Sequence, residues 1–172
     1  MPRNIEIKAS IDSVEAIFPR VAAIADEGPT ELVQDDTFFT CANGRLKLRV
    51  CSETEGELIF YRRADQSGPK ESHYLRSATA SPGSLREALA QAYGLAGRVR
   101  KRRILFIAGR TRIHLDHVEN LGTFLELEVM LRDDEPAARG VEEAQVLMNR
   151  LGVDPSRLVE GSYVDLLAAK GL

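Results

Sequence analysis

Charged residues of one sign alternate with apolar residues along short segments of the sequence. In "GRLKLRV", Arg45, Lys47 and Arg49 alternate with leucine and valine, and in "LELEV" Glu126 and Glu128 do the same. A period of two places such charges on one side of a strand. Basic groups bind phosphate oxygens, whereas clustered carboxylates bind hard cations such as Mg²⁺ or Mn²⁺. Together the two kinds of cluster fit a polyphosphate with its divalent metal.

An Asn-Gly pair between extended segments predicts that the first of two hairpins has a two-residue turn. This register would set Cys41 opposite Leu46 and Cys51 opposite Asp36. The cysteines would then not be neighbours, so we expect both to be reduced.

The second hairpin centres on "AGRT". A two-residue loop there groups Lys101 and Arg103 on one face with Arg112, His114 and Asp116, whereas a three-residue loop would break this grouping. With the other strands included, the shared face would carry Lys8, Arg45, Lys47, Arg49, Arg63, Lys101, Arg103 and Arg112, and with them Glu6, Asp36, Asp116, Glu126 and Glu128.

Two arrangements of the β-sheet are consistent with these charged faces. An ordinary antiparallel sheet would bury its apolar face and show the charges to water. The alternative is a closed sheet whose apolar outside is covered by amphipathic helices, so that the charges point into a wet interior. Because the charges are grouped by strand and mixed in sign, a charged ligand in a closed interior explains the pattern better.

The elements that would position these residues are about eight strands and four helices, joined mostly by hairpins, which indicates an antiparallel sheet. The expected strands are 3–9, 32–41, 45–51, 57–64, 71–78, 98–108, 111–118 and 123–131. Helices are expected after an N-cap at Asp12, from Ser84 to Gly94, over 138–152 and over 160–171. The segment "DQSGPK" is expected to be a polar loop, and Pro19 to kink the first helix.

The composition bounds the class of protein. The chain has 172 residues, 44% hydrophobic and 28% charged, with a formal net charge of −3. These values predict one globular domain over residues 1–172 and argue against a nucleic-acid partner or a membrane surface. No apolar run is long enough for a membrane helix, and "MPRNIEIKAS" lacks a signal core, so we expect a cytoplasmic protein.

The segment "NIEIK" resembles the ExExK signature of the CYTH superfamily, the triphosphate tunnel metalloenzymes. Similar segments follow in the family's order: "QDDTFF", "GRLKLRV", "LIFYRRAD", "GPKESHY", "RKRRILF", "RTRIHLDHVENLGTFLELEV" and "GSYVDLL". The resemblance is nearest to the branch that contains class IV adenylyl cyclases.

The resemblance implies an α+β fold, a closed antiparallel eight-stranded β-barrel or tunnel with helices packed outside. It also implies an enzyme that uses Mg²⁺ or Mn²⁺ on a triphosphate such as ATP, thiamine triphosphate or tripolyphosphate. The expected activity is either adenylyl cyclase, forming cyclic AMP and pyrophosphate, or triphosphatase. Relatives in the family are often homodimers.

The resemblance also assigns roles residue by residue. The implied metal ligands are Glu6, Asp116, Glu126, Glu128 and Asn4. The implied triphosphate ligands are Lys8, Lys47, Arg49, Arg63, Lys101, Arg103, Arg112 and His114. Lys8, the signature lysine, would orient or activate the attacking group, and Arg103 is the second expected catalytic residue.

Two departures distinguish the chain from the family pattern. Asn4 replaces the first signature glutamate, which leaves one metal ligand without charge. The cyclase branch often has a His-Phe pair before the signature, and here only "MPR" precedes it. The alternative to an enzyme is therefore a non-catalytic module that binds a polyphosphate or nucleotide.

Overall fold

The computed structural model describes residues 1–172 as eight strands, four α-helices and one 3₁₀ turn. The strands are β1 (Arg3–Ser10), β2 (Glu27–Phe39), β3 (Arg45–Ser52), β4 (Glu55–Arg63), β5 (Lys70–Thr79), β6 (Leu95–Ala108), β7 (Thr111–Val118) and β8 (Gly122–Met130). The helices are α1 (Val14–Ile24), α2 (Pro82–Tyr93), α3 (Ala137–Arg150) and α4 (Tyr163–Ala169), with the 3₁₀ turn at Pro155–Arg157.

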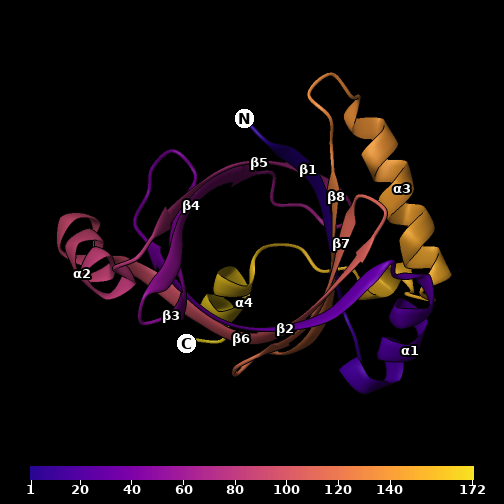
Figure 1. Ribbon diagram of the computed structural model, residues 1–172, viewed down its shortest axis with the longest axis horizontal. Helices are drawn as coiled ribbons and strands as arrows, with labels where there is room; N and C mark the ends of the chain where they lie inside the picture. The colour runs from indigo at the N-terminus through magenta and orange to yellow at the C-terminus, as the bar shows by residue number, and fades with distance from the viewer.

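The strands close into one antiparallel barrel in the order β1-β5-β4-β3-β2-β6-β7-β8, and β8 pairs with β1 to complete the ring (Figure 1). The α+β barrel predicted from the sequence is therefore confirmed. Closure leaves no free sheet edge and gives every strand an inner and an outer face.

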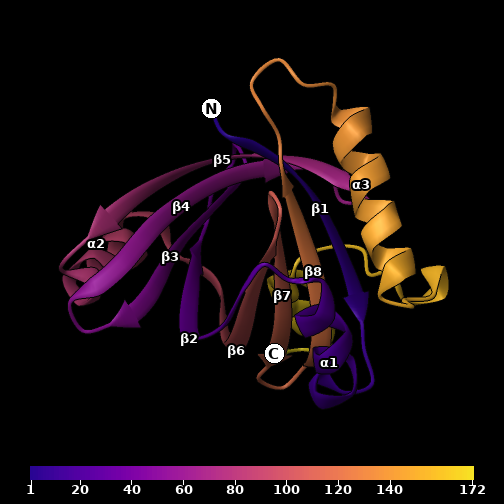
Figure 2. The same cartoon turned by 45° about the vertical axis from the view of Figure 1, so that its right-hand side comes forward.

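The larger apolar core lies outside the barrel. Alternate residues of β1, β7 and β8, such as Ile7, Leu115 and Leu127, are fully buried beneath α1 and α3. Figure 2 shows these two helices beside β1, β7 and β8. Helices on this side take up the apolar face of the alternating strands, so the charged face turns inward.

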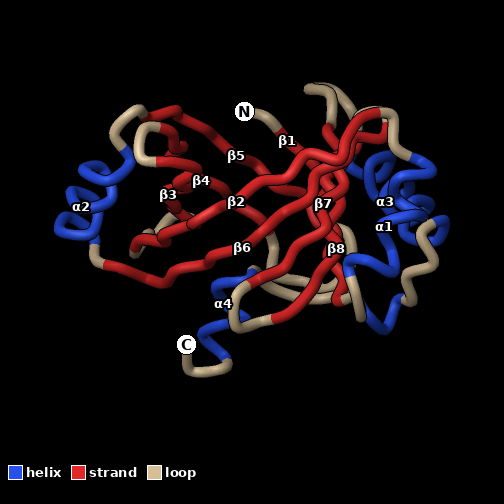
Figure 3. Tube along the Cα trace, turned by 60° about the horizontal axis from the view of Figure 1, so that its bottom comes forward, coloured by secondary structure: helices blue, strands red, loops and turns tan.

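Two helices lie elsewhere. Figure 3 shows α2 at the opposite end of the molecule from α1 and α3. The short α4 lies within the outline of the ring in Figure 1, where its Tyr163, Val164 and Leu167 pack on inner-face residues such as Phe124. A Cβ atom on Gly97 of β6 would clash with a methyl group of Val164, so this close approach requires glycine.

The helix starts differ from those predicted. The cap of α1 is Ser13 rather than Asp12, since the Ser13 hydroxyl accepts the backbone N–H of Ala16. The start of α2 is Pro82 after Ser81 rather than after Ser84, because proline is well suited to the first turn of a helix. The predicted end at Gly94 is confirmed.

The two hairpins test the predicted registers. Ala108 pairs with Thr111, which confirms the two-residue loop in "AGRT". The Asn-Gly hairpin has a longer loop, since Phe39 rather than Cys41 pairs with Leu46. A shift of two residues keeps every side chain on its predicted face. Both cysteines are free, as expected.

One predicted loop is partly wrong. Lys70, assigned to the polar "DQSGPK" segment, is the first residue of β5 and pairs with Glu6 of β1. No helix in the structure combines the length and the apolar character needed to cross a membrane.

Candidate active site

The inner face of the barrel lines a cavity that is partly open to solvent. Its lining includes ten of the predicted site residues: Asn4, Glu6, Lys8, Lys47, Arg49, Arg63, Lys101, Arg103, Glu126 and Glu128. Arg49, Arg76 and Arg103 also line an adjoining hollow of about 880 Å³ that contains Arg112 and His114. The period-two pattern therefore brings these charges together from strands that are distant in the sequence.

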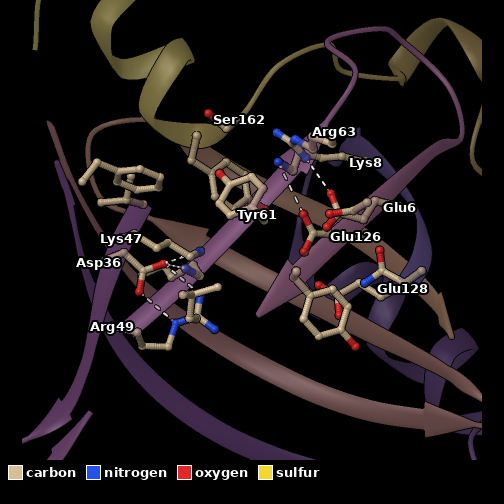
Figure 4. A pocket seen from close by; sticks show the side chains of 18 of the residues that line it. Glu6, Lys8, Asp36, Lys47, Arg49, Tyr61, Arg63, Glu126, Glu128 and Ser162 are labelled. Carbon is tan, nitrogen blue, oxygen red and sulfur yellow. Dashed lines mark hydrogen bonds and ion pairs between the residues drawn. The ribbon is translucent and has the colours of Figure 1, made fainter. Parts of the chain in front are cut away.

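The first group in the cavity surrounds Asp36 and is called here the basic cluster: Asp36, Lys47, Arg49 and Lys101. The Asp36 carboxylate accepts hydrogen bonds from Lys47 at 3.0 Å, from Lys101 at 3.1 Å and twice from Arg49 at 2.8 Å (Figure 4). The residues come from the neighbouring strands β3, β2 and β6. Three cations on one carboxylate leave an excess of positive charge.

Burial and mutual repulsion shape the ionisation of the basic cluster. Burial favours the neutral acid at Asp36, but the adjacent Lys101, Lys47 and Arg49 hold its pKa well below the ordinary value. Burial lowers the pKa of Lys101 to about 7 and that of Lys47 to about 8, although Asp36 opposes both shifts. These lysines would be held charged by an anionic ligand.

The second group is the acidic cluster: Glu6, Glu126 and Glu128. In the β1–β8 ladder Glu6 pairs with Glu128, and Lys8 pairs with Glu126. The ladder therefore sets carboxylates from two strands side by side on the inner face. Figure 4 shows this cluster and the basic cluster in the same cavity.

Basic partners balance part of the acidic cluster. Arg63 donates a 2.6 Å hydrogen bond to Glu6, and the Lys8 amine lies 3.4 Å from a Glu126 oxygen. Burial raises the pKa of Glu6 despite Arg63, and burial lowers the pKa of Lys8 despite Glu126. Burial also opposes ionisation of Glu126, yet Lys8, the His114 hydrogen bond and Arg103 hold its pKa well below the ordinary value.

The acidic cluster offers a donor set that could hold a metal. Ligand atoms of His114, Glu126 and Glu128 all lie within 4.8 Å of one another. The nearby Asn4 is 3% exposed, and its side-chain oxygen is buried without a hydrogen-bond partner. The carboxylate and amide oxygens suit Mg²⁺ or Mn²⁺, whereas the imidazole nitrogen is a ligand more typical of zinc or iron. The oxygen donors therefore fit the divalent cation expected from the sequence.

Asp116 has a different setting from the other predicted metal ligands. Arg103 donates hydrogen bonds of 2.7 Å to both Asp116 oxygens, and the Tyr163 hydroxyl donates a third of 2.6 Å. Arg103 also reaches Glu126 at 3.3 Å. In this structure Asp116 orients Arg103, and its role as a metal ligand stays a prediction.

Arg45, placed by the sequence on the shared face, lies outside the cavity lining. Its guanidinium donates to both oxygens of Asp165 in α4, at 2.9 and 2.6 Å. Ser162 and Asp165 form a capping box at the start of α4. Arg45 therefore fastens α4 to the barrel.

Sequence reasoning assigned no site role to several lining residues. The Tyr163 ring lies 4.0 Å from the Lys8 amine, and Tyr61, Tyr74 and Tyr163 all line the cavity. The alternation of β4 and β5 could have identified Tyr61 and Tyr74. Nothing in the sequence of α4 shows that Tyr163, Val164 and Leu167 pack on inner-face residues of the barrel.

Comparisons with known proteins agree with the fold. The model of the CYTH domain family matches residues 2–163. Adenylate cyclase CyaB of Aeromonas hydrophila is 24% identical over 167 residues, 93% of this chain and 86% of the relative.

Solved structures are also similar in fold. The PH1012 protein of Pyrococcus horikoshii OT3 has a TM-score of 0.84 at 21% identity, covering 95% of this chain and 98% of its own. The Hippeastrum protein HpAC1 has a TM-score of 0.69 at 17% identity, covering 98% and 97%. It is described as an adenylyl cyclase candidate with a dominant triphosphatase activity.

Proposed function

Since this chain belongs to the CYTH domain family, we propose that it is a metal-dependent triphosphatase that cleaves a small triphosphate inside its barrel. The strongest support for the proposal is that the basic and acidic clusters line the same cavity. A phosphate chain needs cations along its length, and its metal needs carboxylates beside it.

The basic cluster would bind and orient the phosphate chain. Lys47 and Arg49 of β3 and Lys101 of β6 converge from two strands that both pair with β2 through barrel hydrogen bonds, so their positions are fixed before substrate arrives. Preorganised cations in a site that excludes most water stabilise developing negative charge better than mobile ones. Phosphoryl transfer depends mainly on such positioning and electrostatics.

Glu6, Glu126, Glu128, His114 and Asn4 would hold the divalent cation, which when bound neutralises phosphate oxygens. In hydrolysis a water oxygen forms a bond to the terminal phosphorus and the bridging P–O bond breaks. Tripolyphosphate then yields diphosphate and orthophosphate, with the water proton released. Lys8 would orient the attacking water, because its amine lies beside Glu126 and its pKa is lowered by burial.

Adenylyl cyclase is the second candidate, favoured by apolar wall residues such as Phe38, Tyr61 and Val99 that could contact a base. The Aeromonas relative named adenylate cyclase points the same way. In that reaction the ribose 3′-hydroxyl attacks the α-phosphorus and pyrophosphate leaves. The triphosphatase is preferred because the Hippeastrum neighbour has a dominant triphosphatase activity.

The test is a substrate panel of ATP, thiamine triphosphate and tripolyphosphate, each with Mg²⁺ or Mn²⁺ and with products separated by chromatography. Orthophosphate release supports the triphosphatase. Formation of cyclic AMP with pyrophosphate from ATP would instead identify the protein as an adenylyl cyclase. Tight binding without any turnover would support the non-catalytic module.

A further inference from the structure

Tyr163 of α4 contacts charged groups from three strands, although the proposed reaction gives it no role. The centre of its ring lies 4.0 Å from the Lys8 amine of β1 and 5.9 Å from the Lys101 amine of β6. Its hydroxyl donates a 2.6 Å hydrogen bond to Asp116 of β7. Tyr163 is 6% exposed and lines the cavity. It therefore lies next to the basic cluster and to the lysine that pairs with the acidic cluster.

The Lys8 amine has few other contacts to hold it. It lies 3.4 Å from a Glu126 oxygen and makes no hydrogen bond to another group of the chain. A lysine side chain is a flexible four-carbon stem, so one ion pair leaves its amine free to move. The Tyr163 ring restricts this freedom, because a desolvated ammonium over a ring face is attracted by the ring electrons. Glu126 and Tyr163 together therefore define where the amine lies.

The backbone that leads to Tyr163 is attached to β1 at Lys8 itself. The Val159 N–H donates a 2.9 Å hydrogen bond to the Lys8 carbonyl. Leu158 forms an isolated antiparallel bridge with Ala9, the next residue of β1. The C-terminal segment therefore contacts Lys8 twice, once with its backbone and once with the Tyr163 ring. These contacts fix the ring relative to the lysine that it covers.

Three further contacts hold the Tyr163 ring in place. The capping box of Ser162 and Asp165 begins α4, and Figure 4 shows Ser162 beside the cavity. Arg45 of β3 donates to both Asp165 oxygens, which fastens the same turn to the barrel. The Tyr163 ring packs on Phe124 of β8, with the two ring centres 5.0 Å apart. The ring is therefore fixed before substrate binds.

We propose that Tyr163 is a positioning residue for the proposed reaction, whose ring holds the Lys8 amine where it orients the attacking water. Its hydroxyl acts separately, since it supports Asp116, the carboxylate that orients Arg103. The inference rests on the proposed triphosphatase. The two parts of the side chain can be separated, because phenylalanine keeps the ring and loses the hydroxyl, whereas leucine loses both. Leucine also keeps an apolar side chain at this buried position, which limits the loss of packing.

The kinetic test measures orthophosphate release from tripolyphosphate with Mg²⁺ by the full chain. The kcat of Tyr163→Leu should lie roughly threefold to thirtyfold below that of Tyr163→Phe, the range expected for a desolvated contact between a cation and a ring. KM should differ much less between the two variants, since the basic cluster keeps the Asp36 carboxylate that holds its cations. The matched control is Tyr93→Leu, which removes a tyrosine that is 58% exposed and should leave kcat unchanged. Equal kcat values in the two Tyr163 variants, or a difference confined to KM, would overturn the inference.

The geometric test needs neither substrate nor turnover. In NMR spectra of the wild-type protein, the Tyr163 ring should shift the Lys8 methylene protons next to the amine upfield, and the shift should persist in Tyr163→Phe and vanish in Tyr163→Leu. The chain has five lysines, so the Lys8 signal is assigned by its loss in Lys8→Arg. Absence of the shift in wild type would overturn the inference without requiring any Tyr163 variant to fold. A shifted Lys8 signal in a protein that releases no orthophosphate would refute the proposed function instead, which separates the two failures.

Discussion

Arg103 and Asp116 face each other across the β6–β7 ladder and form two parallel hydrogen bonds, each 2.7 Å long. Such a bidentate pair fixes the plane of the guanidinium. The Tyr163 hydroxyl occupies the remaining side of Asp116, so the C-terminal helix contributes to this arrangement. Arg103 is thereby aimed at the cavity and at Glu126.

Replacing Asp116 by asparagine should leave the Arg103 charge buried with a poorer partner. We expect the free energy of unfolding to fall by about 3–5 kcal/mol, as for other broken buried pairs. Turnover should fall as well, since Arg103 would lose its fixed orientation. Urea denaturation and phosphate release measure the two effects. The control is Asp35→Asn, which breaks a more exposed pair with Arg98 and should cost at most about 1 kcal/mol. Equal losses in both variants would refute the orienting role.

Glu126→Gln should separate metal binding from anion binding. The amide keeps the shape but loses the charge, so Mn²⁺ affinity should fall at least about tenfold and turnover should be abolished. Mn²⁺ binding is measured by electron paramagnetic resonance. The rise in melting temperature with tripolyphosphate alone should persist, since Glu126 lies outside the basic cluster. Glu143→Gln on α3 is the matched control. A variant with full turnover would exclude Glu126 from the site.

Asn4→Glu should strengthen cation binding. The buried, unpartnered Asn4 oxygen lies next to the acidic cluster, and a carboxylate there adds a charged ligand. We expect Mn²⁺ to bind about tenfold more tightly, which corresponds to roughly 1.4 kcal/mol. Asn149→Glu makes the same change on an exposed helix face and should have no effect. Unaltered Mn²⁺ affinity in Asn4→Glu would show that this position is not part of the metal site.

The lowered pKa values of Lys47 and Lys101, about 8 and about 7, predict opposite effects of pH on stability and on binding. Above pH 7 and up to the ordinary lysine value of 10.5, the unfolded chain binds more protons than the folded protein. Stability should therefore rise with pH in this window, by up to about 1.4 kcal/mol per pH unit for each lysine. Tripolyphosphate requires the charged lysines, so its affinity should fall over the same window.

Melting curves between pH 7 and 9.5, with and without tripolyphosphate, check this prediction. In Lys101→Met, the rise of stability with pH and the fall of tripolyphosphate affinity with pH should both be shallower than in wild type, because one titrating group has been removed. Slopes that match those of wild type would mean that Lys101 keeps its ordinary pKa.

The sequence predicted the residues of the inner face well, because a register error of two residues leaves every side chain on the same face of the sheet. The Asn-Gly hairpin was displaced by two residues, yet Lys47 and Arg49 kept their face. Closure of the sheet was inferred from charges that are grouped by strand and mixed in sign, and the eight-stranded tunnel came from the family resemblance, since alternation alone does not exclude an open sheet. Tyr163 could not be predicted as a site residue, because the packing of α4 on inner-face residues depends on tertiary contacts. Lys70 was assigned to a loop because glycine and proline precede it.

Asp36 has a consequence for which ions the barrel can retain. Its carboxylate already forms ion pairs with the three cations around it. Any incoming anion must therefore compete with the Asp36 carboxylate, which is fixed in the protein. A single orthophosphate or chloride gains little from such an exchange. A chain of linked phosphates could engage the cations without displacing Asp36 from all of them. Under the proposed function, the resident carboxylate would therefore favour binding of the long substrate anion over retention of its shorter products.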